Sequence, residues 1–292
     1  MGKIYKTLIY NNEISLSLLE TTDMVNEAIK LHGLSPVAAA ALGRTLTAVS
    51  FMCSSLKNER DKLSVTIKGG GPGGEIVACG NCRLEIRGYI ENPQVNLPLK
   101  SNGKLDVGGL VGNSGRMTVI KDIGLKSPYV GTTALVSGEI AEDFTAYYAV
   151  SEQQPIAMAL GVRIGTDLSC VGAGGVVLEP LPGAGEESIK KCENLIKEFT
   201  DISKKVETFG IDKIAEKYFG EYEFYKLSPV YKCSCSKEYI DKVLVSLGKE
   251  ELKKEIAENG KIEVCCQFCG KKYEYYEKDV EKLLEDNNGK SD

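Results

Sequence analysis

Short apolar runs separated by glycine dominate the first 180 residues, and most of these runs show the two-residue period of β-strands. Residues 3–20 predict a β-hairpin, because apolar and polar residues alternate on both sides of a turn at Asn11-Asn12. Seven further strands are predicted at residues 63–68, 75–79, 83–90, 116–123, 129–136, 157–165 and 174–181. This part of the chain is therefore expected to be rich in strands.

Three helices are expected between these strands. Thr22 and Asp23 can cap a short helix that stops at Gly33. Residues 38–56 predict a long helix with small or apolar side chains on nearly every face, which is typical of a buried helix. Residues 139–154 show a helical period as well. The expected fold class is α+β, a strand-rich domain with helices inserted between hairpins.

A Pro- and Gly-rich break at residues 180–185 separates this domain from a different pattern. Residues 186–210 predict one helix with a single apolar stripe on an otherwise charged surface. The stripe comprises Ile189, Cys192, Leu195, Ile196, Phe199, Ile202 and Val206. Residues 211–220 predict a shorter helix ending at Gly220. Such helices need a docking surface to stay folded, although a solvated connector helix would show the same pattern.

The last part of the chain predicts a small module. Residues 236–260 predict two helices separated at Gly248, and residues 261–264 and 271–276 predict two strands of a ribbon that turns at Gly270.

Composition supports this division. Of the 77 charged residues, 33 lie in residues 1–180 and 44 in residues 181–292, while 23 of the 31 glycines lie in the first part. We expect a core domain at 1–180, a charged helical linker at 181–226 and a C-terminal module at 227–292. The net charge of −5 gives the chain no global basic field for nucleic acid.

The compartment is inferred from what the sequence lacks. The N-terminus has no apolar signal-peptide core, and no run of 18 apolar residues predicts a membrane-spanning helix. A cytoplasmic location is expected, without a membrane partner. Thiols stay reduced there, so ten cysteines favour metal ligation or redox chemistry over structural disulfides.

Four cysteines near the C-terminus carry the strongest chemical signal. Cys233 and Cys235 form one close pair, and Cys266 and Cys269 form another, 30 residues further on. Two close pairs around a small module are the spacing of a tetrathiolate zinc site, and with a single His in the chain a tightly bound transition metal must rely on sulfur. Four thiolates leave no open position for hydrolysis, so no catalytic residue and no enzyme are expected. Cys265 should point away from Cys266 on a strand, so we assign Cys266 as the ligand and leave Cys265 as either a resolving thiol or a core packing residue.

Other motifs are weaker. Cys79 and Cys82 form a CxxC at a predicted β-turn, where no helix dipole would activate a thiol. The glycines of residues 69–74 match GxGxxG, but a strand follows them instead of a helix, so no cofactor is expected. His32 closes a helix, as a capping residue does. The isolated cysteines are expected to be packing residues: Cys53, Cys170 and Cys192.

Several stretches resemble the bacterial 33 kDa chaperonin family (heat shock protein 33). They are CSC and CQFC near the C-terminus, IKGGGPGG, IRGYIENPQVNLPL, and GGLVGNSGRMTVIKDIGLKSPYVGTTALVSGEIAEDFTAYYAVSEQQP. The resemblance covers essentially the whole chain. Cys79, Cys82 and Cys265 depart from the family's pattern and add thiols that could enter other disulfides.

The resemblance implies a chaperone that holds unfolding proteins without ATP. In the reduced, inactive state one zinc ion would bind Cys233, Cys235, Cys266 and Cys269. Oxidation would form the Cys233–Cys235 and Cys266–Cys269 disulfides, release zinc, and unfold the module and the linker. The active form would be a homodimer that binds unfolding client proteins during oxidative and heat stress.

Two rival functions remain open from the sequence. One is a zinc-ribbon nucleic-acid-binding protein, although 20 lysines face 24 acidic residues after residue 180, with no basic patch around the cysteines. The other is a thiol–disulfide oxidoreductase that uses Cys79 and Cys82.

Overall fold

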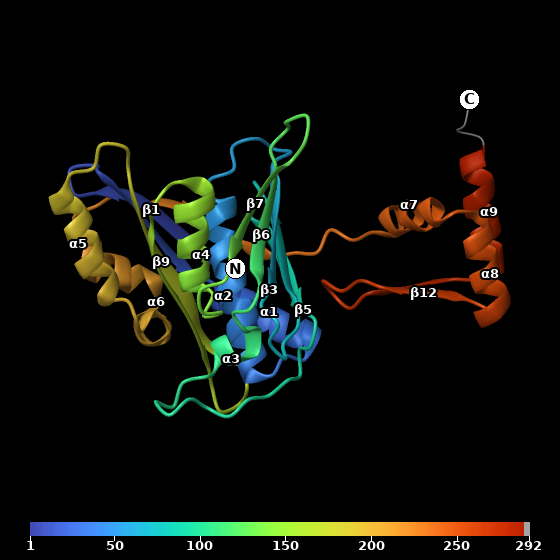
Figure 1. Ribbon diagram of the computed structural model, residues 1–292, viewed down its shortest axis with the longest axis horizontal. Coiled ribbons are helices and arrows are strands. Elements are labelled where there is room, and N and C mark those ends of the chain that lie inside the picture. The colour runs from blue at the N-terminus through green and yellow to red at the C-terminus, as the bar shows by residue number, and fades with distance from the viewer. Residues whose placement is uncertain (289–292) are drawn as a thin grey trace. The chain divides into compact units, whose positions relative to one another are not determined.

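The computed structural model describes residues 1–288 and divides into two compact units, one of residues 1–232 and one that begins at Cys233 (Figure 1). The first unit contains two β-sheets. The five-stranded sheet has the order β10-β1-β2-β9-β8 and the six-stranded sheet the order β11-β5-β4-β3-β6-β7. All neighbours pair antiparallel except β11 and β5.

The strands of the five-stranded sheet are β1 (Lys3–Ile9), β2 (Ile14–Glu20), β8 (Ala157–Ile164), β9 (Cys170–Pro180) and β10 (Tyr225–Leu227). Those of the six-stranded sheet are β3 (Lys62–Lys68), β4 (Ile76–Asn81), β5 (Glu85–Ile90), β6 (Arg116–Asp122), β7 (Tyr129–Ala134) and β11 (Val230–Tyr231). The predicted first hairpin is confirmed, with positive φ angles from Tyr10 to Asn12 at its turn. The seven other predicted strands are confirmed too; β10 and β11 are too short for periodicity to reveal.

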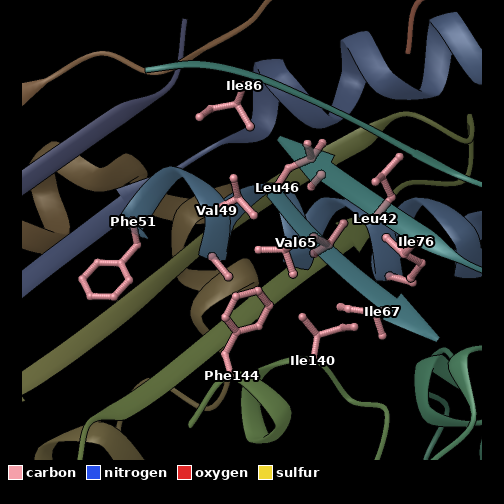
Figure 2. Close-up of a cluster of buried hydrophobic side chains, with 14 of the residues drawn as sticks. Leu42, Leu46, Val49, Phe51, Val65, Ile67, Ile76, Ile86, Ile140 and Phe144 are labelled. Carbon is pink, nitrogen blue, oxygen red and sulfur yellow. The ribbon is translucent and has the colours of Figure 1, made fainter. Parts of the chain in front are cut away.

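Helix α2 (Pro36–Cys53) packs between the two sheets. Pro36 occupies its first turn, and the Ser35 hydroxyl accepts a hydrogen bond from the Ala38 amide at 3.2 Å, so the helix start is well capped. Figure 2 shows its side chains meeting strand residues such as Val65 and Ile67. Helix α2 is long and apolar enough to cross a membrane by composition, but 89% of it is buried inside the protein, as expected for a core helix.

Smaller helical segments complete the first core. They are α1 (Thr22–His32), α3 (Val107–Val111), α4 (Ala141–Tyr147) and the π-helical turn η1 (Tyr148–Glu152). Helix α1 ends at Gly33, whose φ of 60° is left-handed as a terminating glycine allows.

The charged segment after β9 packs against the five-stranded sheet on the face opposite α2 (Figure 1). It forms α5 (Glu186–Lys197) and α6 (Ile202–Phe219), so the prediction of one continuous helix over residues 186–210 was wrong. The chain turns after Lys197 and buries Phe199 completely at the corner. Gly210, with φ 68° and ψ 165°, interrupts α6 because glycine tolerates that conformation.

Glycines bring this segment close to the sheet. A Cβ added at Gly172 of β9 would lie 2.3 Å from the Ser203 carbonyl oxygen of α6. The linker region at residues 181–226 is thus packed within the first compact unit, which continues to Lys232.

The second unit is small. Helices α7 (Lys237–Leu247) and α8 (Lys249–Asn259) meet at Gly248, as predicted. Strands β12 (Ile262–Cys265) and β13 (Lys272–Tyr275) form the predicted ribbon, and α9 (Glu277–Asn288) follows. Its buried apolar residues are Ile240, Leu244, Leu252, Ile262, Tyr273, Tyr275 and Val280.

Candidate metal centre

The two cysteine pairs come from two short segments of the second unit. Cys233 and Cys235 precede α7, whose start is capped by the Ser236 hydroxyl, which accepts from the Tyr239 amide at 3.2 Å. Cys266 and Cys269 lie in the turn of the ribbon after β12. The Cys266 carbonyl accepts from the amides of Cys269 at 3.3 Å and Gly270 at 2.8 Å, which bends the backbone around the sulfur atoms.

The four thiols converge on one point. Their Sγ atoms all lie within 4.8 Å of one another, with 3.7 Å between Cys233 and Cys266 and 3.4 Å between Cys235 and Cys269. A tetrahedral ion with Zn–S bonds of about 2.3 Å separates its sulfur ligands by about 3.8 Å. The donor set and its spacing therefore fit a tetrathiolate metal ion, and all four cysteines are free thiols.

The surroundings of the sulfur atoms differ. Burial opposes ionisation of Cys235, but hydrogen bonds from the Tyr273 hydroxyl at 3.2 Å and from neighbouring thiols outweigh it and lower its pKa to about 7. Burial raises the pKa values of Cys233 and Cys269 instead. One thiol of the cluster is thus ready to lose its proton near neutral pH, as metal binding requires.

Tyr273 is a functional residue that the sequence reasoning missed. It lies on β13 opposite Val264 of β12 and is only 6% exposed. The signal was present in the alternation of residues 271–276, which turns Tyr273 and Tyr275 to the same buried face. Tyr275 donates to Asp241 of α7 at 2.8 Å, so the two tyrosines fasten the ribbon to the cysteine segment and to the helix.

Cys265 lies outside the cluster. It is exposed, and its thiol faces the Gly270 carbonyl at 3.7 Å. The structure thus brings Cys266, and not its neighbour, to the other three thiols.

Cys79 and Cys82 occupy a different environment. Cys79 lies in β4 opposite Arg87 of β5, and Cys82 follows the strand at the hairpin turn. Three residues of extended chain separate Cα atoms by about 10 Å, which exceeds the ~7 Å limit for a disulfide. Burial also raises the pKa of Cys79, so this pair is poorly placed for dithiol chemistry.

The remaining candidates are structural. The glycine run at residues 69–74 packs on the backbone of α3: Gly71 and Gly73 donate to the carbonyls of Val111 and Leu110 at 2.9 Å. His32 ends α1 and lies 3.0 Å from the Tyr231 hydroxyl. Cys53, Cys170 and Cys192 are buried, as expected of packing residues.

The ribbon does not present a basic surface. Lys272 pairs with Glu263 at 2.9 Å, and Lys261 pairs with Glu274 and Glu263. These two lysines are therefore neutralised by neighbours on the ribbon strands, which weighs against a nucleic-acid interface.

Fold and site together define a two-unit protein, in which an α+β body is followed by a small module built around a tetracysteine cluster able to bind a metal ion. The family model described as Hsp33 protein matches residues 2–276. The chain is 42% identical over 285 residues to the 33 kDa chaperonin of Thermoanaerobacter sp. (strain X514), covering 96% of this chain and 97% of that protein.

Two further comparisons agree. The 33 kDa chaperonin of Bacillus subtilis (strain 168) is 40% identical over 287 residues, which cover 97% of this chain and 98% of the relative. The crystal structure of the heat shock protein 33 homolog from Thermotoga maritima superposes with a TM-score of 0.89 at 34% identity and covers 99% of both chains.

The chain belongs to the Hsp33 family. It is accordingly a chaperone for unfolded client proteins, and not an enzyme.

Proposed function

We propose that this chaperone is a redox-regulated, ATP-independent holdase of the cytoplasm, which prevents the aggregation of unfolding proteins during oxidative and heat stress. In the reduced, inactive state one zinc ion is bound by Cys233, Cys235, Cys266 and Cys269. The convergence of these four sulfur atoms within 4.8 Å is the observation that carries the proposal.

Oxidation acts on the same four thiols. An oxidant such as peroxide takes two electrons for each disulfide, Cys233–Cys235 and Cys266–Cys269, and the ligands that held zinc are lost as the S–S bonds form. The pairing rests on the family resemblance, because a tetrahedral cluster brings all four sulfur atoms to similar distances. A module whose described part buries only a small apolar cluster depends heavily on its metal, since structural zinc contributes on the order of 10 kcal/mol to folding.

Loss of the module's fold is proposed to release the linker. Sixteen buried apolar residues form the cluster between the linker helices and the five-stranded sheet, eight from each side. The sheet supplies Tyr5, Ile9, Ile14, Leu16, Leu18, Ala159, Val176 and Leu178, and the linker supplies Cys192, Phe199, Ile202, Val206, Ile211, Ile214, Ala215 and Phe219. Undocking exposes both sets, which gives clients an apolar surface and supports a homodimer of the oxidised form.

This mechanism assigns a function to each part of the expected division. Residues 1–180 form the domain that stays folded. Residues 181–226 form the linker that undocks, and residues 227–292 form the module that responds to oxidation. No nucleic-acid or membrane partner is part of the proposal.

The deciding experiment measures zinc release and aggregation suppression in the same samples. Peroxide at elevated temperature should release one equivalent of zinc per chain and suppress aggregation of a thermally unfolding client without ATP. Cys266→Ser should lose the metal and its redox control, whereas Cys265→Ser, a change at the adjacent thiol outside the cluster, should behave as wild type. Zinc release without any gain in suppression would contradict the switch.

A further inference from the structure

A cavity lies where the linker meets the core, at the corner between α5 and α6. It consists of two adjoining hollows of about 480 Å³ and about 520 Å³, which we call together the junction cavity. The two hollows share residues of both walls, namely Arg44, Lys104, Leu105 and Leu160 from the core and Thr200 from the linker. Both walls belong to the first compact unit, so the complete cavity exists only while the linker is docked.

Positive charge predominates in the junction cavity. Its walls carry six cations and three carboxylates, namely Arg44, Lys100, Lys104, Arg163, Lys197 and Lys204 against Glu139, Glu142 and Asp201. The whole chain has a net charge of −5, so the charge of the cavity is opposite to that of the molecule. An excess of one sign of charge in a hollow concentrates ions of the opposite sign, which here are anions.

Carboxylates compensate three of the six cations. These side chains are therefore held in the walls, and the excess of positive charge comes from the other three. The pairs are Arg44 with Glu139 at 2.7 Å, Lys100 with Glu139 and with Asp106 at 3.5 Å, and Arg163 with Glu207 at 2.7 Å.

The other three cations come from opposite walls. Lys104 lies on the core side, whereas Lys197 ends α5 and Lys204 lies in the first turn of α6. All three are exposed, and none forms an ion pair in the part of the chain that the structure describes. Of the carboxylates, Asp201 already pairs with a lysine one turn further along α6 at 2.9 Å, which leaves Glu142. An anion that neutralises the three lysines must contact the core and the linker at once.

We propose that the junction cavity binds a triphosphate group, which bridges Lys104 of the core to Lys197 and Lys204 of the linker. Lysine binds phosphate as a point charge, and a chain of phosphates spreads its charge over several groups, as three separate lysines require. Arg44 adds a guanidinium group to the same wall as Lys104.

The bridge stabilises the docked linker. A ligand that contacts both walls binds only the docked state, so its binding free energy adds to the stability of that state. The reduced, inactive protein is then the form that binds the triphosphate, and undocking removes two of the three lysines from the site. The ligand thus opposes activation, and activation releases the ligand. This regulatory step rests on the proposed function, whereas the binding site itself does not.

The first experiment measures binding to the full chain in its reduced, zinc-loaded form. The probe is inorganic triphosphate without magnesium, titrated by calorimetry. Lys104→Gln and Lys204→Gln should each weaken binding about fivefold or more, because each removes one attractive charge pair with the ligand. Lys126→Gln is the matched control: this lysine is exposed in the β6–β7 loop, does not line the cavity, and its variant should bind as wild type.

The second experiment tests the bridge by amide hydrogen exchange of the same protein. At a triphosphate concentration about ten times the dissociation constant, undocking becomes about tenfold less favourable. Amides of α5 and α6 that exchange through undocking should therefore slow about tenfold, and amides of β3 in the core should not change. Wild type and Lys126→Gln should respond alike, whereas Lys104→Gln should respond less at the same concentration.

Two further ligands test the chemistry of the anion. Citrate carries several negative charges without phosphorus, and binding as tight as that of triphosphate overturns the assignment of a phosphate ligand. Adenosine triphosphate without magnesium distinguishes two sources of the same group. Comparable affinity supports the triphosphate of a nucleotide as the ligand, and weaker binding supports an inorganic chain.

Unchanged affinity in both lysine variants overturns the site, because triphosphate is then an adventitious ion only, bound elsewhere. Binding without slower exchange in α5 and α6 overturns the bridge. Failure of the proposed function is a separate result, namely no gain in aggregation suppression on oxidation when no triphosphate is present.

Discussion

The two compact units of this chaperone are stabilised in opposite ways. The first surrounds the apolar helix α2 with two sheets and adds a second apolar cluster beneath the linker helices. In its described residues the second unit has seven buried apolar residues and one cluster of four thiols. The large apolar core around α2 needs no metal to stay folded, whereas a small core needs an additional crosslink or metal.

The two units also differ in how easily their cysteine thiols ionise, and thus in how easily they are oxidised. The buried thiols of the first unit resist ionisation: burial raises the pKa of Cys170 to about 11, and Cys192 shows the same shift. In the second unit the pKa of Cys235 falls to about 7. An oxidant that attacks thiolates therefore reacts first with the cysteine cluster of the second unit. That unit is also the one whose fold depends on these cysteines.

Removing the metal should produce the largest effect. A strong chelator in the presence of reductant is expected to unfold residues 233–288 while the core of residues 1–180 stays folded, because zinc supplies on the order of 10 kcal/mol to a structural module. Hydrogen exchange with mass spectrometry checks this: amides of β12 and β13 should lose protection, and those of β3 and β4 should keep it. Persistent protection in the ribbon would show that its apolar core suffices without metal.

A change at Gly172 should distinguish the effect of linker docking on chaperone activity from the effect of metal binding. In Gly172→Ala the new Cβ meets the Ser203 carbonyl at 2.3 Å, so α6 must shift, at a cost of about 1–3 kcal/mol. The variant is expected to suppress client aggregation in its reduced form while it retains zinc. Gly185→Ala is the matched control, because its nearest neighbour there is the end of Glu13 at 3.5 Å.

If Gly172→Ala gains activity only after zinc leaves, docking of α6 is not what restrains the chaperone. The first unit would then contribute nothing to regulation beyond its stability.

Local patterns in the sequence predicted most strands and the burial of α2, because both depend on which neighbours are apolar. The cysteine spacing predicted the cluster for a similar reason: each pair lies within one short segment, Cys233 and Cys235 before α7 and Cys266 and Cys269 in the turn of the ribbon. The break between α5 and α6 was missed, since periodicity identifies Phe199 as buried without showing that the chain bends to bury it.

Long-range pairing was also beyond the sequence. Strands β10 and β11 follow the linker yet pair with β1 and β5, so the compact first unit continues to Lys232. Nothing local in residues 225–231 distinguishes these strands from a loop. The same holds for Tyr273, whose contact with Cys235 joins residues 38 apart.

A smaller effect is expected from the hydrogen bond to Cys235. Tyr273→Phe removes one of the hydrogen-bond donors that together lower the pKa of this thiol to about 7, so its pKa rises and protons compete better with the metal. Zinc affinity at pH 7 should fall about tenfold, as for other partners of metal ligands, and the loss should shrink as pH rises and all thiols ionise. Competition with a chromophoric chelator measures it.

Tyr275→Phe provides the comparison for this change. It removes a hydrogen bond of 2.8 Å to Asp241 from the same strand and the same face without touching sulfur. Its zinc affinity should not show the pH dependence of the Tyr273 variant. Identical pH profiles would mean that both tyrosines act only on the stability of the module.

The smallest expected effect concerns an ion pair that joins α6 to β1. Lys3 lies 2.6 Å from the Asp212 carboxylate, and Tyr5 donates to the same group; these bonds, with Lys3 the stronger influence, lower the pKa of Asp212. A carboxyl group whose folded pKa is depressed stabilises the fold above its unfolded pKa of about 3.9, and this contribution disappears as pH falls through the folded value. Because both side chains are largely exposed, Asp212→Asn should lower the free energy of unfolding by less than about 1 kcal/mol at pH 7.

Urea midpoints of wild type and variant should therefore differ slightly at pH 7 and converge as the pH drops below 4. Adding Lys3→Gln to Asp212→Asn should lower the stability little further. A difference that persists in acid would assign the effect to packing of α6 instead of charge, and the linker would then be held to the sheet by its apolar cluster alone.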